Sequence, residues 1–381
     1  MAIPRNSSST STDHEWTRRE YSQSLTGLIS NRITVLATRG WTPGDLRHEL
    51  GGRVEPLLFL ALPRIATTAP GRIAELWMRD TPPCHLGDPE IGALEKMLRD
   101  LQHLGSLDEW EILSTGDPLE EEARFLAGLS PQQRKAHHRI HALLKKAEST
   151  SFEKEAETLI DKAEQLRQQY RIEAVISDLY SPGMRPGLVA TRVRIGAPWI
   201  RHQFRLLSTV ARAHSCAPLL LTGSGISTVI GTSEDVAHVI DLFTSLNRQR
   251  DHFMRRAPGA QAARENNETS SYRHSFMIAY ASNIGSLLRR AADEVVDSLG
   301  DVAPEAPGSV VAAFEDRRRR AESTLHEFFP DTTSFRLRAY HTSGYRDGRD
   351  AAARSRIGGD SAGLAGRRPM DPGTQNGPMS A

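Results

Sequence analysis

The residues of this sequence best suited to binding chemistry are arginines in a stretch without acidic residues. From Leu179 to Ser233 there is no Asp or Glu, and the six arginines there are Arg185, Arg192, Arg194, Arg201, Arg205 and Arg212. A helix predicted over residues 199–215 places Arg201, Arg205 and Arg212 within about 60° of one another around its axis. Guanidinium groups in such a row suit phosphate oxygens. The candidate ligands for nucleic acid or another anionic partner are therefore Arg194, Arg201, Arg205 and Arg212.

A second interpretation of the basic stretch stays open. Residues 88–123 contain eleven acidic and two basic residues. This acidic segment could pair with the arginines inside the fold, and the arginines could also simply be solvated. The run of arginines at 317–320 is less specific, because four consecutive residues point around most of a helix and Glu315, Asp316 and Glu322 dilute their charge. We expect a solvated helix there.

Motifs for metal-dependent or hydrolytic chemistry are incomplete. His137 and His141 have the spacing of two ligands on one helix face, but no Cys or carboxylate motif accompanies them, and zinc needs three or four ligands. We expect no metal and no cofactor. The sequence has no phosphate-binding glycine loop and no G-x-S-x-G. Catalytic residues stay unknown, and the competing hypothesis is an enzyme of unrecognised type with its site near Arg273, His274 and Gly344.

The elements that position these residues follow from apolar periodicity. After a loop at 181–187 we predict an α-β-β-α unit with a small antiparallel sheet. Its parts are a helix at 199–215, strands at 218–222 and 226–231 joined by a turn at 223–225, and a long helix capped by Ser233. A polar linker is expected at 258–270, a helix at 272–299, a strand at 310–314 and a helix at 316–329. Gly344, Gly348 and Ala352 favour close helix packing, and the alternative is a loop-to-helix start that binds an anion.

The first part of the chain is predicted to be a helical domain. One apolar helix face there consists of Leu25, Leu28, Ile29, Ile33 and Leu36. A further helix begins at Thr42-Pro43, residues 55–65 are strongly apolar, and another helix starts at Asp88-Pro89. Trp41 and the residues after it resemble the turn and second helix of a helix-turn-helix. Asp45 and Glu49 give that helix a poor charge for entering a DNA groove, so we interpret it as structural.

Residues 130–176 predict two helices packed as an antiparallel hairpin. Ser130-Pro131 is a helix start with a serine cap and proline in the first turn. An apolar stripe with helical spacing follows, and Thr150 with Glu153 forms a second capping box. The second helix carries its own stripe, which includes Phe152, Leu159 and Tyr170. Two apolar stripes joined by about three residues pack against each other.

The same residues carry a resemblance to a known family. The pattern Ile140-x-x-Leu143-Leu144-x-x-Ala147, a polar turn, Glu155-Ala156 and Ala163-Glu164-Gln165-Leu166 resembles the signature of DUF2786, a bacterial and phage family of unknown function. Arg167 and Ser149-Thr150-Ser151 depart from that signature. The flanking segments resemble those of actinobacterial members. The resemblance implies an architecture, but it supplies no activity and no catalytic residues.

Bulk properties complete the sequence-based expectations. A chain of 381 residues fits two or three domains, and two cysteines, Cys84 and Cys216, give no disulfide framework, which favours a reducing cytoplasm. The N-terminal residues do not resemble a signal peptide, and no apolar stretch approaches the length of a membrane span. Arginine outnumbers lysine, which also fits a GC-rich genome.

We therefore predict an α+β, mostly α-helical protein with the following parts: a disordered segment at 1–14, a helical N-terminal domain at 15–129, the helical hairpin at 130–176, a C-terminal α+β domain at 188–356 and a disordered tail at 357–381. The favoured function is a cytoplasmic, non-enzymatic bacterial protein that binds nucleic acid or another anionic partner. The alternatives are the unrecognised enzyme and a protein-interaction adaptor that uses the hairpin. The sequence sets neither oligomeric state nor pathway.

Overall fold

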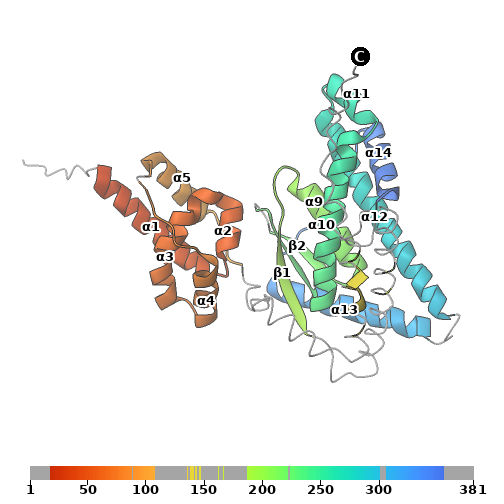
Figure 1. The fold of residues 1–381 in the computed structure, drawn as a ribbon, viewed down its shortest axis with the longest axis horizontal. Coiled ribbons are helices and arrows are strands. Elements are labelled where there is room, and N and C mark those ends of the chain that lie inside the picture. The colour runs from red at the N-terminus through yellow and green to blue at the C-terminus, as the bar shows by residue number, and fades with distance from the viewer. Residues whose placement is uncertain are drawn as a thin grey trace, which may run out of the picture. The chain divides into compact units, whose positions relative to one another are not determined.

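The computed structural model describes two well-defined parts of the chain (Figure 1). They comprise residues 18–107 without 88 and residues 187–355 without 222, 223 and 301–305, together with isolated positions between 135 and 166. Contacts divide the chain into two compact units, one within residues 1–110 and one within 111–381. Most of the predicted hairpin at 130–176 and both predicted disordered ends lie outside the described residues, so these expectations stay predictions.

The N-terminal unit is helical. Its elements are α1 (Arg18–Thr38), α2 (Pro43–Leu50), the 3-10 turn η1 (Gly52–Val54), α3 (Glu55–Thr68), α4 (Gly71–Asp80) and α5 (Ile91–Gln102). Ile29, Ile33 and Leu36 of α1 are fully buried, as the periodicity predicts, whereas Leu28 is 52% exposed and does not belong to the buried face. The Trp77 indole donates to the Trp41 carbonyl at 3.0 Å and so fixes α4 beside the start of α2.

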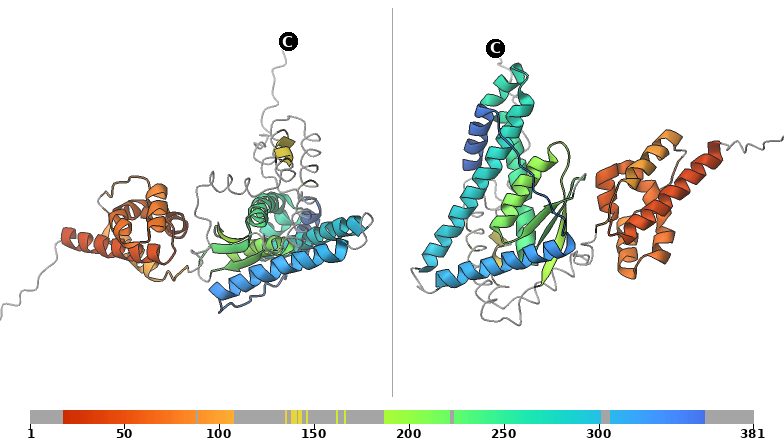
Figure 2. Two further views of the ribbon diagram at one scale, coloured as in Figure 1. Left: turned by 90° about the horizontal axis from the view of Figure 1, so that it is seen from below. Right: turned by 180° about the vertical axis from the view of Figure 1, so that it is seen from behind.

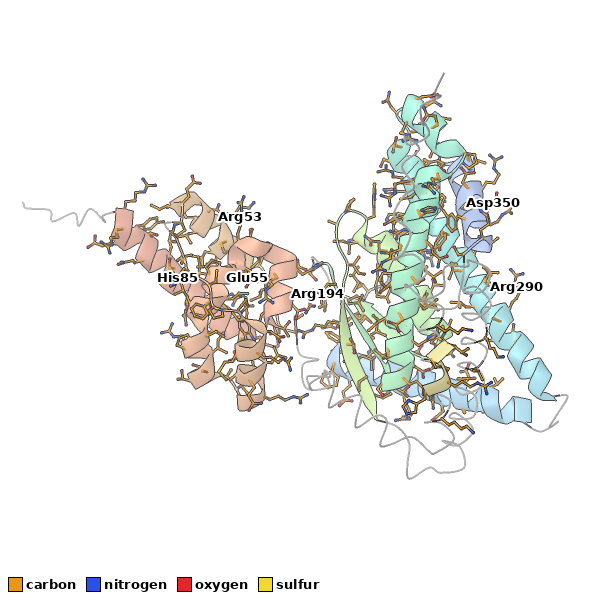
Figure 3. The ribbon with its side chains drawn as sticks, in the orientation of Figure 1. Arg53, Glu55, His85, Arg194, Arg290 and Asp350 are labelled. Atoms are coloured by element: carbon orange, nitrogen blue, oxygen red, sulfur yellow. The ribbon has the colours of Figure 1, made fainter. Side chains whose placement is uncertain are left out.

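The segment that resembles a helix-turn-helix has a structural role. Thr42 caps α2, and Thr42 and Asp45 form a reciprocal capping box in which Asp45 is fully buried. Arg47 is paired with Glu55 at the start of α3, and Glu55 lies within the compact helical unit (Figure 3). Because these charged groups satisfy one another, α2 offers no row of free cations to a DNA groove.

The C-terminal unit combines a three-stranded antiparallel sheet with long helices, which confirms the predicted α+β, mostly α-helical class. Its elements in chain order are β1 (Leu188–Arg194), α9 (Ile200–Ala213), β2 (Ala217–Leu220), β3 (Ile226–Thr232), α10 (Ser233–Arg256), α11 (Gly259–Glu265), α12 (Thr269–Gly300), α13 (Ala306–Phe328) and α14 (Thr342–Ala353). The predicted helix at 199–215 and the predicted strands at 218–222 and 226–231 correspond to α9, β2 and β3.

The strand β1 is the main addition to the predicted α-β-β-α unit. The sheet order is β1-β3-β2, and β1 pairs antiparallel with β3 from Leu188 opposite Thr232 to Arg194 opposite Ile226. Every residue of the central strand β3 is buried. Helices α9 and α10 pack against one face of the sheet, and α13 crosses the other (Figure 2). A strand with no solvated face needs helices on both sides.

Three sequence-based expectations in this unit were wrong. Residues 310–314 belong to helix α13 rather than to a strand, because the second face of the sheet must be covered and Ala313 and Ala321 are buried there. The expected linker at 258–270 contains helix α11. The residue that caps α10 is Thr232, whose side chain accepts from the Asp235 amide, and Ser233 is already helical.

The small residues of α14 allow α14 to lie directly on α12. A Cβ atom at Gly344 would come within 2.4 Å of the Tyr272 carbonyl oxygen, and one at Gly348 within 2.2 Å of the Phe276 carbonyl oxygen. Asp347, buried between them, accepts from the Tyr272 hydroxyl at 2.8 Å and from the Gly259 amide at 2.8 Å. The stripe of small residues therefore serves helix packing, as the sequence predicts.

Candidate anion-binding site

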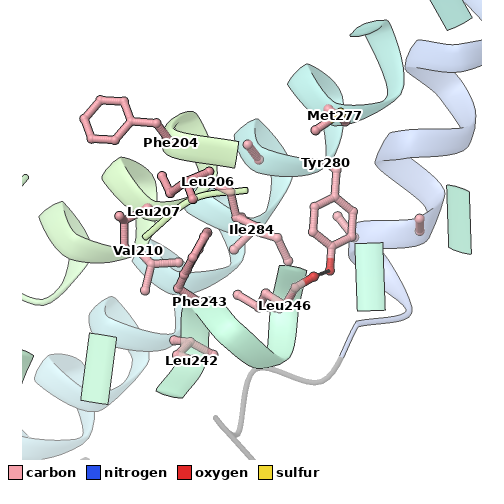
Figure 4. Packing of buried hydrophobic residues seen from close by; sticks show 14 of the residues in the cluster. Phe204, Leu206, Leu207, Val210, Leu242, Phe243, Leu246, Met277, Tyr280 and Ile284 are labelled. Carbon is pink, nitrogen blue, oxygen red and sulfur yellow. Dashed lines mark hydrogen bonds between the residues drawn. The ribbon is translucent and has the colours of Figure 1, made fainter. Parts of the chain in front are cut away.

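Helix α9 is the element that carries the predicted arginine row. Its apolar side, which includes Leu206, Leu207 and Val210, is buried against Leu246 of α10 and Ile284 of α12 (Figure 4). The remaining circumference of α9 is left for polar residues. The burial of one side thus fixes which way each arginine points.

The structure does not place the four predicted arginines on a single open face. Arg201 and Arg212 are exposed near opposite ends of α9. Arg205 is half-buried and donates from Nη2 to the Ser282 hydroxyl of α12 at 3.0 Å. Arg194 is exposed at the last residue of β1 (Figure 3). The predicted arginines are thus divided: Arg194, Arg201 and Arg212 lie on open surface, and Arg205 lies in the contact between α9 and α12.

A basic and aromatic segment that sequence reasoning missed lies beside Arg201. The Phe335 ring lies 6.0 Å from the Phe204 ring, and the Arg201 guanidinium carbon lies 5.5 Å from the Phe335 centroid. Arg336, Arg338 and Tyr340 are exposed, whereas the intervening residues 337 and 339 are partly buried. We name Arg201, Phe335, Arg336, Arg338 and Tyr340 the Arg–aromatic surface.

Two contacts fix the segment that forms this surface. Phe335 holds one end against α9, and the Ser275 hydroxyl of α12 accepts from the Tyr340 amide at 3.0 Å and from the His341 amide at 2.9 Å at the other end. The available sequence signal was a pair of arginines, Arg336 and Arg338, flanked by the aromatic residues Phe335 and Tyr340. Because no regular strand or helix forms there, apolar periodicity does not single the segment out.

The arginines of the Arg–aromatic surface have no acidic partner among the described residues. None of Arg201, Arg336 and Arg338 forms an ion pair or a polar hydrogen bond within the described part of the chain, and the Arg201 guanidinium lies over the Phe335 ring. Exposed cations without acids beside them keep their positive potential for an external anion. Exposed aromatic side chains offer flat faces for stacking.

A second feature, a buried polar cluster, lies where α9, α10 and α12 meet. The rings of His202 and His274 are 4.3 Å apart, and the Trp199 ring is 4.3 Å from that of His274. Gln203 donates to the carbonyls of Gly196 at 2.7 Å and Pro198 at 2.9 Å, which fixes the loop before α9. From α10, the Asn247 amide donates to the Gln203 side-chain oxygen at 3.1 Å.

Several buried polar atoms of this cluster have no hydrogen-bond partner among the described residues. The nitrogens are His202 Nε2, His274 Nε2, Arg205 Nε and Arg250 Nη1, and the oxygen is Asn247 Oδ1. Arg250 is 3% exposed, and its other nitrogens donate to the more exposed Asp251 at 2.8 and 3.3 Å. Buried polar groups usually find partners, so a concentration of unpartnered polar atoms marks this junction as a candidate ligand site.

Electrostatics at the junction disfavour additional positive charge. Burial, followed by the neighbouring His274, Arg250 and Arg205, lowers the pKa of His202 from 6.5 to about 4. Burial also lowers the pKa of His274. Both imidazoles are therefore neutral near pH 7 while two guanidinium groups stay charged. This arrangement favours an anion.

The residues named for the competing enzyme hypothesis do not converge on one site. Arg273 is exposed, His274 belongs to the buried cluster, and Gly344 is packed on the Tyr272 carbonyl. Ser343 Oγ lies 3.1 Å from His341 Nδ1, but that nitrogen accepts from the Gly344 amide and so caps α14. The Ser343–His341 contact is thus explained by helix capping.

No metal centre is formed within the described residues. No group of three or more His, Cys, Asp or Glu side chains there is placed to hold an ion. Cys84 and Cys216 are free thiols in different units. His137 and His141 lie outside the described residues, so the helix-face pair that they suggest is not described.

Comparison with known proteins addresses the middle of the chain. Residues 135–174 match the family described as "Protein of unknown function (DUF2786)". The DUF2786 resemblance seen in the sequence is thereby confirmed for this segment. No curated protein and no solved structure matches the chain. Within the described parts of the chain, no helix is both long enough and apolar enough to cross a membrane.

Proposed function

We propose that the protein binds single-stranded nucleic acid through the Arg–aromatic surface. The observation that carries the proposal is the exposure of Phe335 and Tyr340, at 39% and 78%, beside arginines that have no acidic partner in the described structure. Arginines contact the phosphate backbone, and aromatic rings stack with bases that are not paired in a duplex. A purely electrostatic surface would not need exposed rings.

The spacing within the segment supports the same function. Arg336, Arg338 and Tyr340 alternate with the partly buried residues 337 and 339, so the three side chains project from the same side of the segment. Arg201 extends this surface along the first turn of α9. A continuous run of cationic and aromatic groups suits a strand that follows the surface, and a cytoplasmic location would give it access to such strands.

The test is fluorescence anisotropy of labelled single-stranded and double-stranded DNA and RNA over a salt series. We expect preference for single strands and a log–log salt slope that becomes shallower by about 0.7 for each phosphate contact removed. The test variant is Arg336→Gln/Arg338→Gln. The matched control is Arg318→Gln/Arg319→Gln, which removes the same charge from α13, where these arginines are paired with acids.

Three results would contradict the proposal in whole or in part. One is the absence of binding by the native protein at about 50 mM salt, where phosphate contacts are strong. The second is an equal loss of affinity in the test and control variants, which would show that only total charge matters. The third is equal affinity for duplex and single-stranded nucleic acid, which would mean that the exposed rings do not stack with bases and that the surface binds by charge alone.

A further inference from the structure

The buried cluster at the α9–α10–α12 junction combines two histidines and two arginines, several of whose buried nitrogens have no hydrogen-bond partner among the described residues. His202 and Arg250 are 7% and 3% exposed, and His202 Nε2 and Arg250 Nη1 have no hydrogen-bond partner among the described residues. His274 Nε2 and Arg205 Nε, from α12 and α9, are also buried and without partners there. An unpartnered guanidinium nitrogen in the interior is costly, which suggests that this arrangement serves a ligand.

The start of α9 adds further donors at the same place. Trp199 precedes the helix with φ of 75° and provides no side-chain acceptor for the first amides of the 14-residue helix. An aromatic residue in the left-handed region is strained, and such strain is concentrated at functional positions. The uncapped amides of a helix N-terminus attract anions. The His202 and Gln203 amides donate to the Trp199 carbonyl at 2.9 and 3.0 Å, which leaves the two amides before them for an anion, and the His202 side chain extends from the same turn.

We propose that this cluster, formed by His202, His274, Arg205, Arg250 and the first turn of α9, binds a phosphate-class oxyanion. The anion is either free inorganic phosphate or the terminal phosphate of a nucleic acid. The terminal phosphate of a nucleic acid, but not the free ion, rests on the proposed function. Guanidinium and imidazole groups both donate to phosphate oxygens, and an anion among them would supply the charge that the cluster lacks.

Binding at this cluster takes up a proton. The charged or titratable groups that face it are, from α9, His202 and Arg205, from α10, Arg250 and Asp251, and from α12, His274 and Tyr280. Burial and neighbouring cations hold the pKa of His202 at about 4. An oxyanion beside the ring favours the imidazolium and raises that pKa. For a given charge form of phosphate, the affinity therefore increases as the pH falls from about 7 toward 5.

The experiment is a titration of the full chain with inorganic phosphate at constant ionic strength, with chloride as the control anion. Calorimetry measures affinity and proton uptake, and NMR follows the imidazole signals of His202 and His274. We expect saturable binding, proton uptake, and a His202 pKa that rises when phosphate is present. The absence of saturation by about 10 mM phosphate at pH 6, where even a weak site fills, would overturn the proposal.

Variants separate the site from general charge. Arg205→Gln removes a cluster donor, and Arg212→Gln removes the same charge from the exposed end of the same helix. We expect about tenfold weaker phosphate binding for the first and no change for the second. If Arg205→Gln does not fold, His274→Gln at the half-buried edge of the cluster takes its place, with His252→Gln on the exposed side of α10 as its control. Equal effects in test and control would overturn the proposal.

A pair of oligonucleotides of one sequence, with and without a 5′-phosphate, identifies the source of the anion. Stronger binding of the phosphorylated strand, lost in Arg205→Gln, identifies the nucleic-acid terminus as the ligand. Equal binding of both strands together with saturable inorganic phosphate identifies the free ion. Phosphate binding without any oligonucleotide binding refutes the proposed function and still supports this site.

Discussion

Two arginine-rich regions of the C-terminal unit differ in what their arginines face. On α13, Arg317 is buried and pairs with Asp235 at 3.2 Å, and Arg318 pairs with Glu315 at 2.8 Å on the exposed side. On the Arg–aromatic surface, by contrast, Arg336 and Arg338 have aromatic neighbours along the chain and no acid partner among the described residues. The first region has the higher density of arginine, yet the second keeps its charge available.

The position of acidic residues decides more about these two regions than the number of their arginines does. Glu315, Asp316 and Glu322 lie three or four residues from the arginines of α13, which is the spacing at which helical side chains meet. The expectation that residues 317–320 form a helix whose arginines are diluted by acids agrees with these pairs. It did not foresee that Arg317 turns inward and fixes α13 to the start of α10.

The largest expected effect is on the buried pair of α13. Arg317→Met should lower the free energy of unfolding by about 3–5 kcal/mol, because Asp235 would stay buried without its cation. Urea denaturation followed by circular dichroism measures the change. Arg319→Met, at a side chain that is 74% exposed, is the control and should have little effect. Similar losses in both variants would show that the buried pair is not special.

The next effect concerns the exposed rings. Phe335→Ala and Tyr340→Ala should each weaken single-strand binding by about five- to a hundredfold, which corresponds to about 1–3 kcal/mol of stacking. Tyr340→Phe keeps the ring and should keep the affinity. Tyr21→Ala, at an exposed tyrosine of the other unit, serves as the control in the same anisotropy assay. Unchanged affinity in both Phe335→Ala and Tyr340→Ala would mean that the rings do not contribute to binding and that only the arginines do.

Acid should destabilise the buried cluster around His202, which belongs to neither arginine-rich region. The folded pKa of His202 is about 4, below the unfolded value of 6.5, so the unfolded chain binds a proton that the folded chain excludes between these values. Stability should therefore fall by about 1–3 kcal/mol as the pH decreases from about 6.5 to 4 in phosphate-free buffer. Urea midpoints across this range measure it.

A matched pair of histidine variants assigns that acid response. His202→Gln should flatten the dependence of stability on pH, and His326→Gln, on the exposed side of α13, should leave it as it is. An unchanged slope in His202→Gln would mean that another group is responsible.

The smallest effect is expected at the surface pairs of α13. Glu315→Gln breaks the exposed pair with Arg318 and should change the free energy of unfolding by less than about 0.5 kcal/mol. The same urea denaturation measures this change in the free energy of unfolding, which is compared with the larger loss expected for Arg317→Met. A loss comparable to that of the buried pair would mean that the surface pairs stabilise α13 cooperatively.

Sequence reasoning recovered the elements whose signals are local. The amphipathic pattern of residues 199–215, the two strands after it, and the Gly344–Ala352 stripe all correspond to observed features. The strand β1 was not predicted, because a short strand forms only through its hydrogen bonds to a partner strand, and the sequence of β1 alone does not show that pairing. Residues 310–314 were predicted to form a strand, because a five-residue apolar run has the same pattern in a buried strand and in a helix that packs on a sheet.

The candidate site was predicted only in part. Arg201 lies on the Arg–aromatic surface and Arg205 belongs to the buried cluster, but their roles differ although both lie on α9. His202 and His274 are 72 positions apart in the sequence, so no spacing rule could have paired them. Arg336 and Arg338 lie in an irregular segment, where periodicity carries little weight.

The sequence by itself determined the helical periodicity, the helix starts at Thr42 and Trp199, the absence of common catalytic motifs, and the DUF2786 resemblance of the central segment. These properties depend on residues close together in the chain. Only the tertiary structure decided which arginines are paired, which histidines meet, and which aromatic rings stay exposed. These properties depend on side chains that are far apart in sequence and are brought together by the burial of apolar helix faces around one sheet.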